Sequence, residues 1–494
     1  MCAEKNVTHV VECGKRFWQR FRNRLVNIIE YIANHSRIIS LLVSPLISIG
    51  IGILFEFNSK QLVALAAFVF SILGAFFFWK YKLIVAFVSV TMLLTLGVID
   101  VSTLIESSEF DIILFLIAMT LIIAPLKRVG FFRWLTLFLL KISNFNIKAL
   151  VMLFMVTSMI FAGIMGAVSS IVVITAMVME FSDYFELDSK LFIILSILAS
   201  NIGSSATALG NPVGLILALG ADLSFEEFLR WSAPLAFLSI AIVILYVMKV
   251  HGSFLDEVQL KINKGLRERK ITLNLWSVIG DLKKFFLASF IFAITIISLS
   301  LHRLFASFLS LEGKTMLVGL AFLGAALALT LYKEESKEIV EREVDWWSLL
   351  FITFLFGETG ALKYTGVTNR LAYQLLHFTH GNISSILLII SISVFFLSAF
   401  LDNVPTVAAF IPIVLDFRMA GLNIYPIWWI ILISGCYAGN LTPLASAANM
   451  VALGILEKRK INISLREWLY VSFIPTIIVY IISISLLYIQ FFIL

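Results

Sequence analysis

The sequence predicts an all-α polytopic membrane protein, and three observations support that prediction. The 494 residues are 60% hydrophobic and 14% charged, whereas a soluble domain is about 45–50% apolar and about 25% charged. The apolar runs have helical length and lack the alternation of a membrane β-barrel. The second half of the sequence also repeats the first at a constant offset. We therefore expect about 11 transmembrane helices in two inverted repeats, each with a re-entrant hairpin and a broken helix.

The first half begins with a basic stretch and an apolar run at 38–55. No small-residue cleavage pattern follows this run, so we interpret it as a retained first helix. Ordinary spans are expected at 61–79, 82–99 and 111–126. Elements of other kinds follow. They are an amphipathic segment at 127–141, an apolar stretch at 148–181 interrupted by Gly163 and Gly166, a second interrupted stretch at 190–220, and a last helix at 232–250.

The second half has the same order of elements. Residues 251–284 are too polar and basic to cross a bilayer, so they predict a linker between the halves. The elements after it are expected at 285–302, 315–332, 346–362, 363–377, 384–417, 426–456 and 470–493. The chain is thus divided into 1–60 (basic N-terminus and first helix), 61–250 (first repeat), 251–284 (linker) and 285–494 (second repeat).

The repeat persists over a long stretch at one offset. The alignment that places Lys127 on Lys363 also places Gly130 on Gly366 and GAVSSIVVITAMVMEF (166–181) on DNVPTVAAFIPIVLDF (402–417). A slightly larger shift places SFEEFLRW (224–231) on SLREWLYV (464–471). Leucine-rich segments align easily by chance, but a constant offset over both the amphipathic segments and the hairpins predicts a true internal repeat.

The distribution of basic residues orients the halves. Basic clusters occur near Lys15 to Arg24, at Lys80, at Lys127 to Arg133, in the linker and at Lys458 to Lys460. Placing each of them in the cytoplasm makes the N-terminus and linker cytoplasmic and the C-terminus external. Equivalent hairpins then open to opposite sides, which is the arrangement of a transporter that alternates access. We expect a multi-pass protein of the plasma membrane.

Polar residues cluster where the helices of the two repeats are predicted to be broken. An unwound segment frees backbone groups that lipid cannot satisfy, so it must face protein, an ion or water. The two broken helices read SNIGSSATALGNP (200–212) and GNLTPLASAAN (439–449), and the two hairpin tips lie near Gly163 to Ser170 and at DNVPT (402–406). Hydroxyl, amide and freed carbonyl oxygens suit sodium, while the N-termini of half-helices suit an anion.

These motifs resemble the ion transporter superfamily and, within it, the citrate-transporter-like group. That group includes arsenite pumps, D-type sodium/proton antiporters, the P protein and divalent-anion:sodium symporters. The resemblance covers about residues 61–494. It implies elevator-type motion, frequent homodimers and ion and substrate sites lined by Ser169, Ser170, Asn201, Thr207, Asn211, Asp402, Asn403, Thr406, Asn440, Thr442 and Asn449. The expected ion- and substrate-binding set also includes Gly210, Pro212, Pro405 and Gly439, and sodium is expected at Asn201, Asp402, Asn403 and Asn440.

Two acids in apolar surroundings are candidates for ion coupling. A carboxylate near the membrane midplane is costly unless it meets a cation, a proton or a partner, which favours a coupling role for Asp402. Asp402 also has the position of an N-cap, and the two roles are compatible. Glu358 is a second candidate for proton coupling, with an interfacial location or a pairing with Lys363 as the structural alternative.

The sequence predicts a secondary active transporter that moves a small inorganic or carboxylate anion together with sodium or protons. The anion is expected on backbone N–H groups of Ser170, Gly210 and Asn211. The alternative is a sodium/proton antiporter in which Asp402 binds sodium and protons in turn. No nucleotide-binding loop, catalytic triad or histidine cluster occurs in the sequence, so we expect no enzyme, no bound cofactor and no nucleic-acid partner.

Overall fold

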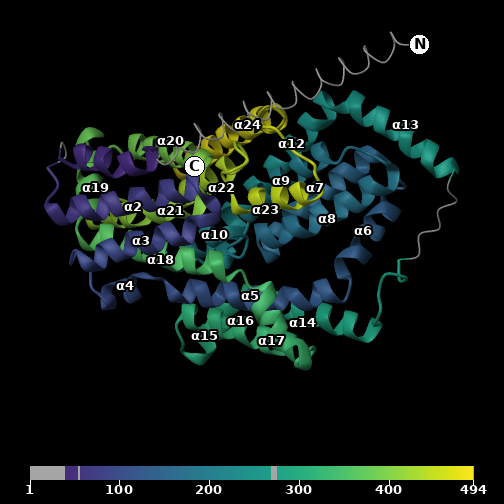
Figure 1. Cartoon of the computed structure of the whole chain (residues 1–494), viewed down its shortest axis with the longest axis horizontal. Helices are drawn as coiled ribbons and strands as arrows, with labels where there is room; N and C mark the ends of the chain where they lie inside the picture. The colour runs from purple at the N-terminus through teal and green to yellow at the C-terminus, as the bar shows by residue number, and fades with distance from the viewer. Residues whose placement is uncertain (1–38, 54–55, 269–274, 493–494) are drawn as a thin grey trace, which may run out of the picture. The chain divides into compact units, whose positions relative to one another are not determined.

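The computed structural model describes residues 39–53, 56–268 and 275–492 (Figure 1). The basic residues Lys15 to Arg24 lie outside the described residues. Throughout the described part the regular elements are helices, without a strand, which confirms the predicted all-α class. These residues include nine helices that are long and apolar enough to cross a membrane. Four further apolar helices in the regions expected to span are shorter than the nine. They are Ile39–Ile53, Lys82–Thr95, Lys190–Ser204 and Tyr425–Ala438.

The chain divides into two compact units, Met1–Val98 and Ile99–Leu494. In the first unit, α2 (Ser59–Phe77) packs against α3 (Lys82–Thr95). Gly74 allows this approach, because a Cβ on it would lie 2.3 Å from Cγ1 of Val85. The Ser89 hydroxyl donates across the pair to the Ala67 carbonyl at 2.5 Å.

The second unit contains both hairpins and both broken helices. Its first part comprises α4 (Val101–Ser107), α5 (Phe110–Arg128), α6 (Phe131–Ile142), α7 (Ile147–Met165), α8 (Ala167–Phe185), α9 (Lys190–Ser204), α10 (Pro212–Gly220), α11 (Phe225–Trp231) and α12 (Ala233–Val250). The predicted linker begins with a helix, α13 (Gly252–Glu268).

The remaining helices of the second unit continue the chain to Phe492. They are α14 (Leu282–Ser300), α15 (His302–Leu309), α16 (Gly313–Thr330), α17 (Ser336–Glu343), α18 (Trp346–Tyr364), α19 (Val367–Phe378), α20 (Ile383–Phe400), α21 (Asn403–Met419), α22 (Tyr425–Ala438), α23 (Ala447–Lys458) and α24 (Leu465–Phe492).

The helix boundaries follow the internal repeat. The first residues of α5/α18, α6/α19, α7/α20 and α8/α21 are all separated by the same interval as Lys127 and Lys363. Gly130 and Gly366, which precede α6 and α19, both have φ of 81°, a left-handed conformation that glycine adopts without strain. Reciprocal caps at the starts of α11 and α24 are also equivalent, formed by Ser224 with Glu227 and by Ser464 with Glu467.

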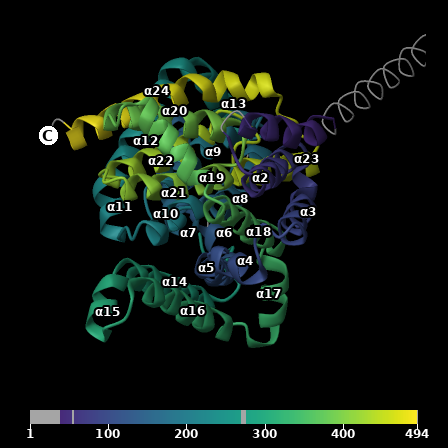
Figure 2. The same cartoon turned by 90° about the vertical axis from the view of Figure 1, so that its left-hand side faces the viewer.

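The helices of the second unit form two groups (Figures 1 and 2). Helices α14 to α17 lie together on one side of α5, and α5 packs against α14, α16 and α17. The other group holds the hairpins and broken helices, in which α7 packs on α9 and α20 packs on α22. The hairpins and broken helices of the two repeats interlock, because α8 packs on α23 and α21 packs on α10.

One predicted break is misplaced. Gly163 lies inside α7, and the first hairpin turns only at Gly166, where φ is 89° and ψ is 148°. Gly163 serves close packing instead, since a Cβ on it would lie 3.3 Å from the Gly203 carbonyl oxygen of α9. Gly203 is itself helical, and a Cβ there would meet the Met159 carbonyl oxygen at 2.2 Å.

Candidate transport site

The two broken helices meet at their breaks through the side chain of Asn201. Its Nδ2 group donates to Oδ1 of Asn440 and to Oδ1 of Asn449, each at 2.9 Å. Its Oδ1 accepts from the hydroxyl of Ser446 at 3.1 Å. Asn201, Asn440 and Asn449 are each at most 1% exposed. Two breaks that are far apart in the sequence therefore form one buried amide cluster, which we call the central amide cluster: Asn201, Asn440, Ser446 and Asn449.

The second break is held in shape by the same cluster. Nδ2 of Asn449 donates to the carbonyl oxygens of Gly439 at 2.7 Å and Thr442 at 3.0 Å. The indole of Trp468, which is fully buried, donates to the carbonyl of Asn440 at 3.0 Å. The backbone carbonyls freed between α22 and α23 thus find donors within the protein, as an apolar environment demands.

The first break is organised by Asn211. Its Oδ1 accepts from the Gly214 amide at 2.7 Å and so caps α10, while its Nδ2 donates to Ser204 at 2.7 Å and reaches Sγ of Cys436 at 3.1 Å. Pro212 follows as the first residue of α10, where its missing N–H is not needed. Gly210 is sterically required, because a Cβ would lie 2.1 Å from the Ser204 carbonyl oxygen.

The first hairpin tip is seated on the first break. The Ala167 amide, at the start of α8, donates to the Gly210 carbonyl at 2.9 Å. The Thr207 hydroxyl donates to the Gly163 carbonyl, and the Ser200 hydroxyl donates to the Ala167 carbonyl at 3.3 Å. The tip and the break therefore form one hydrogen-bonded unit.

Two backbone N–H groups that we expected to hold an anion already have acceptors. The Ser170 amide donates to Gly166 at 3.0 Å, and the Gly210 amide donates to Thr207 at 3.3 Å. The Ser170 hydroxyl donates to the Ser158 carbonyl at 3.0 Å, so this buried side chain braces the hairpin. Ser169 is only partly buried.

The second hairpin tip is stabilised by Asp402. Its Oδ1 accepts from the Val404 amide at 3.2 Å, so the expected N-cap role is present, with Val404 as the donor. The Thr406 hydroxyl donates to the Asp402 carbonyl at 3.1 Å, and the Thr442 hydroxyl ties the second break to the Ala399 carbonyl at 2.6 Å. Asn403 and Pro405 are buried in the first turn of α21.

Glu358 lies in the interior of the protein. It is on α18, has no exposed surface, and belongs to a helix that packs against α21.

Two half-helices begin together at the central amide cluster. Helices α8 and α23 pack against each other, and Arg459 pairs with Asp183 at their C-terminal ends, so the two helices run in parallel. At their N-terminal ends, Ala167 contacts Ser200 and Ser446 contacts Asn201. Gly166 has no side chain to cap α8, and the Ser446 hydroxyl donates to Asn201 instead of capping α23.

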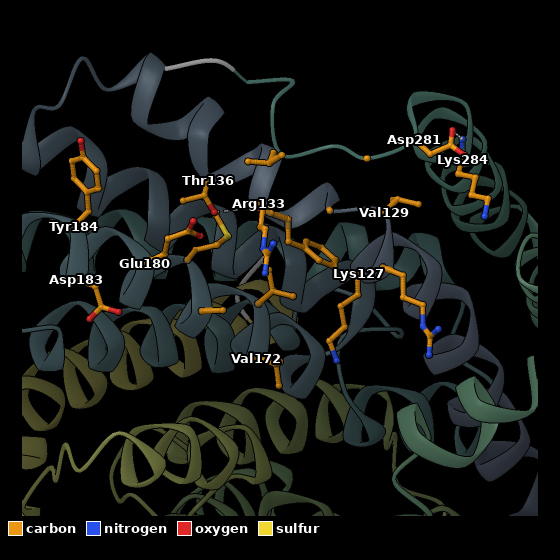
Figure 3. A pocket seen from close by; sticks show the side chains of 18 of the residues that line it. Lys127, Val129, Arg133, Thr136, Val172, Glu180, Asp183, Tyr184, Asp281 and Lys284 are labelled. Atoms are coloured by element: carbon orange, nitrogen blue, oxygen red, sulfur yellow. Dashed lines mark hydrogen bonds between the residues drawn. The ribbon is translucent and has the colours of Figure 1, made fainter. Parts of the chain in front are cut away.

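Two cavities lie at opposite ends of α5. The large cavity, of about 1020 Å³, is lined by Lys127 at the end of α5 and by the face of α8 from Val172 to Asp183 (Figure 3). The small cavity, of about 210 Å³, is lined by Glu109 at the start of α5, by Lys363 at the end of α18 and by α21. A 19-residue helix is about 28 Å long, so the cavities approach from opposite sides.

The cavities are equivalent in the repeat. Val172 and Ala176 line the large cavity, and their counterparts in the second repeat, Ala408 and Pro412, line the small one. The ends of α5 and α18 that carry the equivalent Lys127 and Lys363 face different cavities, so these helices run in opposite directions. The two repeats are therefore inverted.

Comparison with known proteins agrees with this architecture. The model of the citrate transporter family matches residues 65–375 and 359–493. The chain belongs to the citrate transporter family. An uncharacterized transporter of Mycobacterium bovis is 26% identical over 401 residues, covering 78% of this chain and 87% of that protein. The human P protein is 21% identical over 437 residues, covering 75% of this chain and 52% of its own length.

A solved structure supports the fold of this family member. The YdaH transporter of Alcanivorax borkumensis matches with a TM-score of 0.52 and 13% identity, over 79% of this chain and 88% of that one. With its apolar helices, the family assignment makes this chain a multi-pass membrane transporter.

Sequence reasoning missed two residues of this candidate site. Cys436 was not identified as a site residue, yet its Sγ accepts from Nδ2 of Asn211 at the first break. Trp468 was not singled out, yet it holds the Asn440 carbonyl. A signal for Trp468 existed, because the alignment of SFEEFLRW with SLREWLYV places it on Phe228, which is also fully buried. No sequence signal identified Cys436.

Proposed function

We propose that this protein is a secondary active transporter that moves a small anion or oxyanion coupled to sodium or protons. The observation that carries the proposal is the meeting of the N-termini of α8 and α23 at Ser200 and Asn201. Each helix N-terminus carries about half a positive charge, and neither N-cap side chain neutralises it here. Two such ends side by side favour an anion in an otherwise apolar environment.

The class of anion follows from what surrounds those helix ends. The central amide cluster offers amide and hydroxyl groups, and neither broken segment, 205–211 or 439–446, contains Arg or Lys. A multivalent anion would then need compensating cations or protons. Citrate, succinate, phosphate, sulfate and arsenite are the candidates, and citrate comes first because of the family's name.

The coupling ion is proposed at the second hairpin tip. Helices α10 and α21 also pack together, but Asn211 caps the first and the carboxylate of Asp402 caps the second. The carboxylate of Asp402 therefore gives this pair of helices a negative charge at an N-cap, which the pair α8 and α23 lacks. Asp402, with amide oxygens of Asn403, Asn201 and Asn440, supplies hard oxygen ligands for sodium, or a proton acceptor. Glu358 is proposed as a second proton carrier.

Alternating access is proposed from the unequal cavities. The large cavity stands open beside the first hairpin, and its counterpart beside the second hairpin is small. Motion of the hairpins and broken helices against α5 and α14 to α17 would exchange the two, as an elevator mechanism requires. By the positive-inside rule the large cavity faces the cytoplasm of a plasma-membrane protein. A homodimer through the α14 to α17 side is part of this proposal.

A sodium/proton antiporter is the second candidate. The observation that favours it is Asp402, a carboxylate at a half-helix start whose first turn contains no basic residue. In that mechanism the carboxylate would bind sodium and protons alternately, and no anion would be carried.

Transport in proteoliposomes decides between the two. The purified protein would be reconstituted, sodium and pH gradients imposed separately, and uptake of the five anions measured. We expect one anion to accumulate only when a cation gradient is present. Dissipation of a pH gradient by sodium with no anion present would support the antiporter instead, and the absence of both fluxes would reject secondary transport.

A further inference from the structure

We infer that the large cavity contains an anion-binding site of its own, at Arg133, which captures the cargo before it reaches the hairpin tip. This inference rests on the proposed function, because it supposes an anionic cargo. The cavity reaches Val172 on α8, five residues from the first residue of that helix, or about 8 Å along its axis. The cavity therefore extends toward the start of α8, where the central site is proposed.

The cavity wall carries more positive than negative side chains. Its charged lining residues are Lys127, Arg128, Arg133, Lys284 and Arg459 against Glu180, Asp183 and Asp281. A cavity with low-dielectric walls focuses the field of such charges and raises the local concentration of ions of opposite sign. Counted alone, the lining side chains therefore carry a net positive charge.

Most of these cations already have acidic partners. Arg459 pairs with Asp183, Lys127 pairs with Glu343 at 2.9 Å, and Arg128 pairs with Glu335. The Lys284 ammonium lies 5.0 Å from the ring centre of Tyr332. These contacts keep four of the five cations engaged with groups of the protein.

Arg133 differs from the other cations of the cavity. Within the described part of the chain it has no ion pair at 4.0 Å or less, and it is exposed to the cavity. Figure 3 shows Arg133 on α6 and Glu180 on α8 extending into the same space. A planar guanidinium presents a fork of donors that matches carboxylate and oxyanion oxygens, so Arg133 is the group on which an anion would bind.

The small cavity has no arginine at the position equivalent to Arg133. The residue equivalent to Arg133 in the second repeat is Asn369, and the charged residues of the small cavity are Glu106, Glu109 and Lys363. The two entrances therefore have opposite charge balance. Capture at Arg133 should make the apparent affinity for the anion higher from the mouth of the large cavity than from the other mouth.

The same guanidinium chemistry suits a free anion and the phosphate of an anionic lipid. To separate the two sources, equilibrium binding of radiolabelled citrate, succinate and phosphate would be measured on the full chain in nanodiscs of phosphatidylcholine alone and with added phosphatidylglycerol. Binding in phosphatidylcholine that is lost in Arg133→Gln supports a site for the free anion. Absence of binding for all three anions overturns the inference, and so does equal binding by the wild type and Arg133→Gln.

The transport test compares entry from the two sides in right-side-out and everted vesicles. We expect Arg133→Gln to raise KM for citrate about fivefold from the mouth of the large cavity, with kcat and the opposite KM unchanged. Arg133→Lys should recover part of the loss. Raising the ionic strength from about 0.01 M to about 0.15 M shortens the Debye length from about 30 Å to about 8 Å. The difference in KM between the wild type and Arg133→Gln should therefore become smaller.

Lys141→Gln is the matched control, since Lys141 is exposed at the end of the same helix and does not line the cavity. A KM increase that is equal on both sides, or equal in Lys141→Gln, overturns the inference. If the wild type carries no anion while Arg133-dependent binding persists, the proposed function fails and the anion site stands.

Discussion

The side chain of Asn201 donates to that of Asn440 at 2.9 Å, and this bond joins two helix ends through residues that are 239 positions apart in the sequence. Asn201 belongs to α9 of the first repeat, and Asn440 follows α22 of the second. Each break is also hydrogen-bonded to the hairpin of its own repeat. The pairs are Ala167 with Gly210 in the first repeat and Ala399 with Thr442 in the second. Hydrogen bonds therefore link each hairpin tip to its own break and link the two breaks to each other.

Replacement of Asn201 tests this connection. Asn201→Ala removes the donor to Asn440 and Asn449 and leaves their buried amide oxygens without that partner, at a cost of about 1–3 kcal/mol for each group. We expect a lower apparent Tm in detergent and loss of gradient-driven transport. Asn369→Ala is the control, because Asn369 is exposed on α19. Equal Tm and transport in the two variants would contradict the structural role of Asn201.

Close packing of α7 on α9 depends on Gly203. In Gly203→Ala the new Cβ would lie 2.2 Å from the backbone oxygen of Met159, and backbone cannot rotate away as a side chain can. We expect destabilisation of about 2 kcal/mol or more, comparable to overpacking in a core. Gly319→Ala in α16 has open space within 4 Å and should raise stability by up to about 1 kcal/mol. Thermal unfolding followed by the fluorescence of a size-exclusion peak measures both.

The two roles of Asp402 can be separated by substitution. Asp402→Asn keeps an N-cap oxygen for Val404 but removes the charge, so we expect unchanged thermal stability and loss of cation coupling. Asp402→Ala should lose coupling and also about 1 kcal/mol of stability. The readout is anion uptake under imposed sodium and pH gradients. Retained coupling in Asp402→Asn would reduce Asp402 to a capping residue.

Sequence analysis predicted the elements of the fold better than their contacts. The constant repeat offset and the apolar periodicity were sufficient to predict both hairpins and both broken helices. The break at Gly163 was wrong because a glycine in an apolar run indicates either a turn or a close approach, and the sequence does not distinguish them. Only the structure shows that the carbonyl oxygen of Gly203 lies opposite it.

The candidate site was predicted as a set of residues without its geometry. Asn201, Asn440 and Asn449 were selected for their polarity in breaks, and the structure brings them together with Ser446. Their meeting depends on how α9 crosses α22, a long-range relation that no local pattern encodes. The large cavity was likewise not predictable, because its wall is assembled from α5, α6, α8 and α14.

Stability should depend on pH through His302, which begins α15 outside the spanning helices. Burial lowers the pKa of its imidazole below the ordinary 6.5. The unfolded chain therefore binds a proton below about pH 6.5 that the folded protein binds only at lower pH, so stability falls on acidification from that point, by up to about 1.4 kcal/mol per pH unit. We expect His302→Gln to flatten the slope of apparent Tm between pH 6.5 and 5.5. His377→Gln, on an exposed position of α19, should leave the slope unchanged.

Equivalent positions in the two cavities should exchange accessibility during transport. Val172 lines the large cavity and Ala408 lines the small one, and they occupy the same position of α8 and α21. With the three native cysteines replaced by serine, Val172→Cys should react quickly with a small charged thiol reagent from the mouth of the large cavity. Ala408→Cys should react slowly, because Ala408 is 3% exposed.

An imposed ion gradient together with the transported anion should reverse this order, since opening one cavity of an inverted repeat closes the other. We expect the labelling rate of Ala408→Cys to rise from the opposite side of the membrane as that of Val172→Cys falls. Rates that rise together would indicate a continuous channel. Rates that do not respond to any gradient or anion would contradict alternating access through these two cavities.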